Sequence, residues 1–317
     1  MDYVECVEEY LEHLVVEKNR SLRTVVAYRH YFDRLGDFLG ENATMADITT
    51  DRVRKYRIHL ASFLDEHTNP LSLKTQSYHL IALRSLLRYA ARRDIACLPP
   101  DKIELPKTES AEVQFLTSEE LERLLEQPET ATMGGLRDRA LMELLFSTGL
   151  RVSEVASLDR QKVSTTSGEL RVVGKGRKER LVFISPRAAE WLEEYFSRRG
   201  DPNPAAFVGY RGRGTSEIPS PKVEANATRL TPRSIDRVIT SHARGAGLIK
   251  KITPHTLRHS FATDLLSNGA DIRSVQTMLG HASITTTQVY THVTDPQLHK
   301  VHRKYHGQHL ETEESET

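Results

Sequence analysis

The stretch TPHTLRHSFAT, residues 253–263, carries the signals that start a helix and holds two histidines and an arginine within five positions. Thr253 suits the N-cap position and Pro254 the first helical position, so His255 falls in the first turn. Unpaired backbone N–H groups and the positive end of the helix dipole favour an anion there. The stretch therefore predicts a helix whose start faces negative charge and whose other face is buried through Leu257, Phe261 and Leu265.

Two interpretations of this helix start compete. His255 and His259 stand four residues apart, which is the spacing of two zinc ligands in a helical metalloprotease motif. His255 and Arg258 stand three apart and can instead face one anion. A zinc hydrolase of this type needs a glutamate after the first histidine, and that position holds Thr256. The anion is favoured, while a zinc hydrolase and a merely polar helix start remain as alternatives.

Composition indicates a two-domain protein of the reducing cytoplasm. The chain has 317 residues, 38% of them apolar, and a formal net charge of +1. It holds no apolar run long enough to cross a membrane, and its start, MDYVECVEEYLEHL, is acidic, unlike a secretory signal. Two cysteines, Cys6 and Cys97, form neither a disulfide framework nor a metal cluster. Residues 111–310 carry 28 basic and 22 acidic side chains, and their basic run RVVGKGRKER, residues 171–180, fits either an ordinary solvated hairpin or a phosphate-binding surface.

The first domain, residues 1–105, is predicted to be entirely helical. Apolar residues recur at helical spacing in four segments, and no segment alternates as a strand would. Residues 98–115 hold three prolines and no helical period, so residues 106–113 are assigned to an interdomain linker. The four helices are expected over residues 3–17, 21–39, 50–64 and 72–93.

The second domain, residues 114–310, is predicted to bring an arginine and a lysine to exposed corners. A helix over 135–146 stops at the sequence STG, where Gly149 can adopt the left-handed conformation of a helix end. A new helix opens at once, which places Arg151 at the corner. Strands over 169–173 and 180–184 flank GKGRKE, so Lys175 lies at a hairpin tip.

The remainder of this domain is expected to be loop and helix. Residues 202–232 are rich in Pro, Gly, Ser, Asn and Thr and are predicted to be mostly loop. Further helices are expected over 232–245 and 254–268, then in a short helix that ends at Gly280, in one that carries Tyr290, and in a last one that begins near Asp295. An acidic tail, residues 311–317, closes the chain.

Four stretches in this order resemble the tyrosine recombinases, and most closely the Xer-type recombinases: TGLRVSEVASL (148–158), VVGKGRKERLV (172–182), HTLRHSFAT (255–263) and LGHASITTTQVYTHV (279–293). The resemblance implies a mainly α fold with a small β-hairpin, made of an N-terminal helical core-binding (SAM-like) domain and a C-terminal catalytic domain. It also implies a catalytic set and two supporting residues. The catalytic residues are Arg151, Lys175, His255, Arg258, His281 and the nucleophile Tyr290, and the supporting residues are Glu154 and His259.

The chemistry of these residue types agrees with that assignment. A tyrosine that attacks DNA keeps the phosphoryl group as an ester, so the bond energy is retained for rejoining. Arg151 and Arg258 can bind the non-bridging oxygens, and Lys175 can protonate the departing 5′-oxygen. His255 and His281 can donate to the phosphate or help to take the tyrosine's proton. We therefore expect neither a metal nor a cofactor.

The resemblance implies a site-specific DNA recombinase that works through a 3′-phosphotyrosine intermediate, in chromosome or plasmid dimer resolution. Its expected partners are a double-stranded DNA site and further copies in a tetramer, with a paralogue or a DNA translocase as additional partners. The expected location is the cytoplasm, at the nucleoid and not at a membrane. Alternatives are an integrase of a mobile element, a type IB topoisomerase and a DNA-binding protein that no longer cuts. Two features depart from the family pattern: a long loop over 211–231, and Gly307 where a proline is common.

Overall fold

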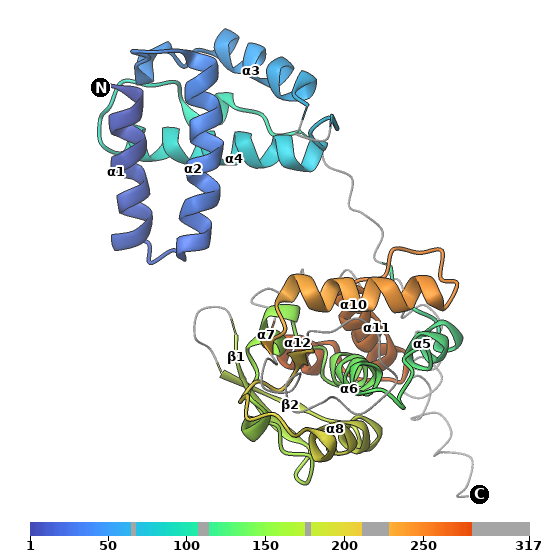
Figure 1. The fold of residues 1–317 in the computed structure, drawn as a ribbon. Helices are drawn as coiled ribbons and strands as arrows, with labels where there is room; N and C mark the ends of the chain where they lie inside the picture. The colour runs from blue at the N-terminus through green and yellow to red at the C-terminus, as the bar shows by residue number, and fades with distance from the viewer. Residues whose placement is uncertain (65–67, 107–113, 175–178, 211–227, 281–317) are drawn as a thin grey trace, which may run out of the picture. The chain divides into compact units, whose positions relative to one another are not determined.

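The computed structural model describes residues 1–64, 68–106, 114–174, 179–210 and 228–280. The chain divides into two compact units, Met1–Ala111 and Glu112–Thr317 (Figure 1). Most of the linker, the hairpin tip, much of the long loop, and everything after Gly280 lie outside the described residues. In the described part of the chain, no helix is long and apolar enough to span a membrane.

The first unit is built from four helices, as the apolar spacing predicts. α1 and α2 lie side by side and α4 crosses them, with α3 packed against α2 and α4 (Figure 1). Each helix begins after a short polar residue whose side chain accepts a backbone N–H, which is the ordinary way to satisfy a helix start. The bounds are α1 (Tyr3–Val16), α2 (Leu22–Leu39), α3 (Thr50–Ser62) and α4 (Leu73–Ala91).

Polar groups of buried aromatic residues tie these helices together. The hydroxyls of Tyr10 on α1 and Ser85 on α4 lie 2.6 Å apart. The hydroxyl of Tyr56 on α3 lies 3.1 Å from Nδ1 of His79 on α4. Because His79 is buried, its pKa is lowered to about 4, so it stays neutral in the core.

The second unit is organised around α6 (Met133–Thr148), whose residues 139–145 are all buried. The neighbours α5 (Ser118–Leu125), α8 (Pro186–Arg198), α10 (Pro232–Gly245) and α11 (Pro254–Ser267) pack around it (Figure 1). A helix that is enclosed in this way has buried residues on several of its faces. The shorter helices α7 (Val152–Ser157) and α12 (Ile272–Leu279) contact α10 and α11, respectively.

The β structure is a small addition to this helical unit, so the predicted fold class is confirmed. β1 (Glu169–Val173) and β2 (Glu179–Phe183) pair antiparallel, with Val172 opposite Arg180. The second strand begins one residue earlier than predicted. Within the segment 202–232, which is predicted to be mostly loop, β3 (Val208–Gly209) pairs with β4 (Thr228–Arg229). Strands of two residues are too short to produce an alternating pattern in the sequence.

Candidate active site

The corner that carries Arg151 forms as the sequence predicts. Gly149 ends α6 in the left-handed conformation (φ 59°, ψ 25°), and its N–H donates to the Leu145 carbonyl at 3.0 Å. A side chain at this position would collide with Phe261, since a Cβ would lie 2.4 Å from its Cδ1 atom. The chain then turns at Arg151, which has extended backbone and is the N-cap of α7. The predicted glycine turn is therefore confirmed.

Helix α11 also starts where its sequence signals lie. The Thr253 side chain accepts the N–H of Thr256 at 3.3 Å, and Pro254 occupies the first position of the helix. His255 is only partly covered by its neighbours, whereas Arg258 retains only 4% of its accessible surface. The two residues differ because Arg258 points into the packed unit, where its guanidinium group reaches other elements.

Three arginines from different elements converge on the end of α12. The last carbonyls of a helix have no partner within the helix and carry the negative end of its dipole, so they attract cationic donors. Two of these arginines, Arg151 and Arg258, belong to the predicted catalytic set. The bonds run from Arg180 Nε to the Met278 carbonyl (2.8 Å), from Arg258 Nη2 to that of Leu279 (2.6 Å) and from Arg151 Nη2 to that of Gly280 (3.0 Å).

A buried carboxylate, Glu154, joins two of these arginines. Its oxygens accept the backbone N–H of Arg151 at 2.8 Å and Nη1 of the same residue at 3.0 Å. They also accept Nη1 and Nη2 of Arg180 at 2.8 and 2.7 Å. Burial alone would raise the pKa of Glu154, but the hydrogen bonds from Arg180 and Arg151 outweigh it and lower the pKa. Glu154 is therefore a carboxylate at neutral pH and holds Arg151 at both its backbone and its side chain.

The two histidines of α11 are held in the neutral form. Partial burial, followed by the charges of Arg258 and Arg151, lowers the pKa of His255, against an opposite effect from Asp236. Burial lowers the pKa of His259 to about 4, with His255 and Arg258 acting in the same direction. Neutral His255 can accept a proton at pH 7, which a protonated imidazole could not do.

The low pKa of His259 predicts an acid-labile second unit. The unfolded chain binds a proton near pH 6.5 and the folded unit only near pH 4, so stability is lost as pH falls through this window. The loss is at most about 3 kcal/mol. Urea unfolding followed by the fluorescence of Trp191, the one tryptophan in the sequence, measures this unit directly. His259→Gln should flatten the pH dependence, and an unchanged slope in that variant would contradict the assignment.

The described residues contain only part of the predicted catalytic set. Arg151 and Arg258 meet at one helix end, with Glu154 beneath Arg151. Lys175, His281 and Tyr290 lie outside the described residues. Arg180 is not among the predicted site residues, although it ends the run GKGRKER and is a polar residue at an inward position of a strand.

The His255–His259 pair gains no further metal ligand in the described segments. Among those residues, no group of three His, Cys, Asp or Glu side chains is placed to hold a metal ion. The structure thus offers no described ligand set for the zinc alternative.

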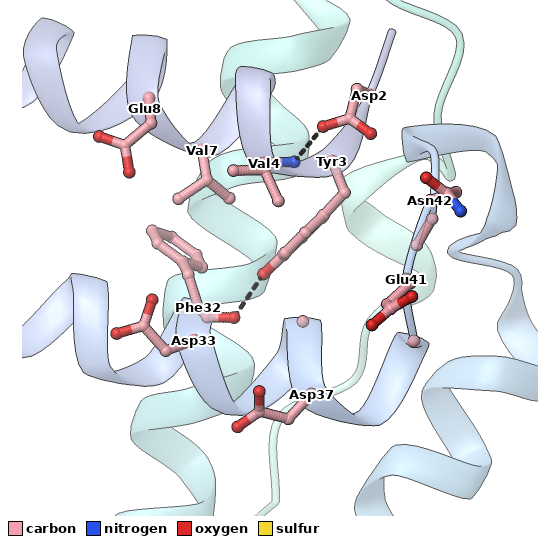
Figure 2. Close-up of a pocket in the computed structure, with 13 residues that line it drawn as sticks. Asp2, Tyr3, Val4, Val7, Glu8, Phe32, Asp33, Asp37, Glu41 and Asn42 are labelled. Atoms are coloured by element: carbon pink, nitrogen blue, oxygen red, sulfur yellow. Dashed lines mark hydrogen bonds between the residues drawn. The ribbon is translucent and has the colours of Figure 1, made fainter.

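A cavity in the first unit is lined by carboxylates (Figure 2). It has a volume of about 590 Å³ and lies between the start of α1 and the end of α2. The Tyr3 side chain lines it, and its hydroxyl donates to the Phe32 carbonyl at 2.8 Å (Figure 2). Such a lining repels phosphate, so this cavity does not suit a nucleic acid. The acidic residues of this acidic cavity are Asp2, Glu8, Asp33, Asp37 and Glu41.

A second hollow, at the other end of α1, has the opposite character. It has a volume of about 440 Å³ and is lined by the end of α1, the residues that follow it and the second half of α4. Tyr10, His13 and Glu17 complete its wall together with the basic residues. The cations of this basic hollow are Lys18, Arg20, Arg88, Arg92 and Arg93.

Comparisons with known proteins agree with this geometry. Residues 114–297 match the model of the phage integrase family, and residues 7–94 match that of the phage integrase N-terminal SAM-like domain. Tyrosine recombinase XerD of Pseudomonas putida is 35% identical over 95% of this chain and 96% of its own length. The chain belongs to the tyrosine recombinase family. The resemblance seen in the sequence motifs is thus confirmed, and the matched range includes Lys175, His281 and Tyr290.

This tyrosine recombinase is also similar to other recombinases and to an integrase. Tyrosine recombinase XerC of Pelobacter propionicus is 35% identical, with 96% of this chain and 95% of that protein covered. The structure of XerH site-specific recombinase in a post-cleavage complex with palindromic difH substrate aligns with a TM-score of 0.64 at 25% identity, over 93% of this chain and 82% of that one. The DNA-bound lambda integrase dimer shares the fold, with a TM-score of 0.68 at 18% identity over 92% and 95% of the two chains.

Proposed function

We propose that this recombinase cuts and rejoins DNA at a specific site through a 3′-phosphotyrosine formed by Tyr290. The observation that supports it most is the convergence of Arg151 and Arg258 on the end of α12. His281 directly follows Gly280, the C-cap of this helix, and Tyr290 lies nine residues after His281. Two guanidinium groups at one helix end supply the paired positive charge that a phosphoryl-transfer transition state requires.

The two arginines contribute in different ways. The side chain of Arg151 is 29% exposed and can offer donors to a phosphate from the protein surface. Arg258 is buried and is bonded to the Gly149 and Leu279 carbonyls, both at 2.6 Å. A fixed charge in a poorly solvated position acts more strongly on a nearby anion than an exposed one does. Arg258 would therefore stabilise the charge of the phosphate from a distance, and Arg151 would donate hydrogen bonds to it directly.

The remaining steps fall to residues assigned by the motifs. Tyr290 needs help to lose its proton, since a free phenol has a pKa of about 10. Neutral His255 is suited to accept that proton, and His281 would donate to the phosphate. Lys175 would protonate the 5′-oxygen as the bond to it breaks, leaving a free 5′-hydroxyl. Glu154 and His259 would support Arg151 and Arg258.

DNA would be bound by both units. The basic hollow gives the first unit a patch of five cations suited to backbone phosphates. Residues 1–105 would form the core-binding domain, 106–113 the linker, 114–310 the catalytic domain and 311–317 a tail. Four copies would exchange strands on paired sites, with a paralogue or a DNA translocase as further partners. Identity to proteins named XerC and XerD supports dimer resolution at the nucleoid in the cytoplasm as the task.

A trapping assay tests the chemistry. Duplexes that bind the Tyr290→Phe variant are selected from a random-sequence pool and then nicked near the centre, so that cleavage releases a short fragment and traps the covalent intermediate. Wild type should form a protein–DNA adduct in the presence of EDTA, and mass spectrometry should place the nucleotide on the peptide that contains Tyr290. The Tyr290→Phe variant serves as the control, and an adduct formed by this variant would refute the nucleophile assignment.

The DNA products distinguish a recombinase from a topoisomerase and from a protein that only binds DNA. Two duplexes of different length should yield recombinant strands if the enzyme rejoins to a partner. A type IB topoisomerase would instead relax supercoiled DNA and restore the original strands. Binding without adduct would identify a protein that no longer cuts.

A further inference from the structure

Arg180 occupies an unusual position for a charged residue. It lies on β2 opposite Val172, and its side chain is 8% exposed. The other residues on this face of the hairpin, Leu170, Val172 and Val182, are buried and apolar. A buried arginine is costly unless its charged group is paired and hydrogen-bonded. Arg180 meets this condition, because each of the three nitrogens of its guanidinium group donates a hydrogen bond.

Those three bonds join three separate segments. Two parallel bonds reach Glu154 in α7 at 2.8 and 2.7 Å, and the third reaches the Met278 carbonyl near the end of α12 at 2.8 Å. The paired geometry fixes the orientation of the carboxylate, which a single bond would not do. Glu154 in turn holds the backbone and the guanidinium group of Arg151. Arg180 thus links the lysine-bearing hairpin, the Arg151 corner and the end of α12.

Gly280 leaves the space that this arrangement needs. Its backbone is left-handed (φ 63°), and a Cβ at this position would lie 3.0 Å from Cδ of Arg180. The glycine therefore serves both the conformation of the helix end and the passage of the arginine side chain.

We propose that Arg180 is a positioning residue for DNA cleavage, which acts by holding Glu154, and through it Arg151, in register with the end of α12. The proposal rests on the function proposed above. Arg180 itself does not touch the phosphate. Displacements of about 1 Å in groups that surround a reacting centre can lower a rate about a hundredfold. Loss of Arg180 should therefore slow the chemical step and leave DNA affinity nearly unchanged.

A second arginine in the same unit provides a matched control. Arg139 bonds to the buried carboxylate of Glu143 at 3.0 Å and to the Leu125 carbonyl at the end of α5. Glu143 keeps a second arginine partner, Arg187, at 2.7 Å. Arg139→Gln and Arg180→Gln thus remove the same kinds of hydrogen bonds and leave the same kind of carboxylate with one arginine. Arg139 also lies over the ring of Trp191 at 4.8 Å, so the stabilities of these two variants are compared by circular dichroism. Of these two arginines, only Arg180 shares its carboxylate partner with Arg151.

The test compares wild type, Arg180→Gln, Arg180→Lys and Arg139→Gln in single-turnover cleavage of the trapping duplex. For Arg180→Gln we expect a rate constant about a hundredfold lower at saturating DNA, with a Kd within about threefold of wild type. Arg180→Lys should recover part of the rate, because it keeps the charge and loses the paired geometry. Arg139→Gln should unfold as easily as Arg180→Gln and cleave at the wild-type rate.

Amide hydrogen exchange provides a readout that does not need activity. Exchange should accelerate in peptides covering 149–155 and 278–280 in Arg180→Gln, and should stay unchanged there in Arg139→Gln. Unchanged exchange in Arg180→Gln, or cleavage within about threefold of wild type, would overturn the proposal. If wild type forms no adduct while exchange accelerates, the proposed function fails and the anchoring by Arg180 stands.

Discussion

Replacing Arg258 with alanine is expected to lower the rate of DNA cleavage by about a thousandfold, because the buried charge nearest the end of α12 is lost. The same change should destabilise the second unit by about 2–5 kcal/mol, since the Gly149 and Leu279 carbonyls each lose a charged donor. Single-turnover cleavage measures the first effect, and urea unfolding followed by Trp191 fluorescence measures the second.

A pair of lysine variants separates the two effects of Arg258. Arg258→Lys keeps the charge but cannot reach both carbonyls, so it should lose stability and most of the activity. Arg199→Lys makes the same change at another buried arginine, which donates to the Ala205 and Ala206 carbonyls and also pairs with Asp201 at 2.6 Å. That control should lose stability only. Wild-type cleavage by Arg258→Lys would show that charge alone is sufficient.

The Gly149→Ala substitution is expected to destabilise the second unit by about 2–5 kcal/mol, from left-handed backbone and overpacking together. The added Cβ would lie 2.4 Å from Cδ1 of Phe261 and 3.1 Å from Cδ2 of Leu279. Relief of this clash would push α11 and α12 away from the Arg151 corner, so cleavage should fall as well. Both effects are measured as for Arg258.

Gly247 supplies the control for backbone conformation. It is also left-handed (φ 69°), but a Cβ there would meet nothing within 4 Å. Gly247→Ala should therefore cost only about 1–2 kcal/mol and preserve cleavage. Equal losses in the two alanine variants would show that the contact with Phe261 has no role.

Local signals allowed much of the fold to be predicted from the sequence. Helix starts at Ser21 and Thr253, and helix ends at Gly149 and Gly280, lie where the predictions place them, because caps depend on neighbours in the chain. The predictions did not include α5 or α8, although Thr117 caps the first and Ser185 the second. These two N-caps are the same kind of sequence signal as Ser21 and Thr253, so both helices could have been predicted.

The candidate site was predictable in its residue types and not in its contacts. Arg151 and Arg258 stand in motifs that reveal their chemistry, and the structure brings them to one helix end. Their partners are backbone carbonyls, which every residue has, so no sequence pattern marks them. Arg180 was missed for a different reason, because its main partner is a side chain far away in the sequence. Its significance comes from Glu154, which lies 26 positions away in the chain.

The acidic cavity lies at the start of α1 and the basic hollow at its end. The first unit therefore has a charge dipole along that helix. If DNA binds at the basic hollow as proposed, we expect such a unit to turn before contact, so that Arg88 and Arg92 arrive ahead of Asp2 and Asp33. Orientation during the approach should speed capture, and the same cations should then hold the bound DNA through its phosphates. Added salt should therefore slow capture, because it shortens the screening length, and should also shorten the lifetime of the bound state.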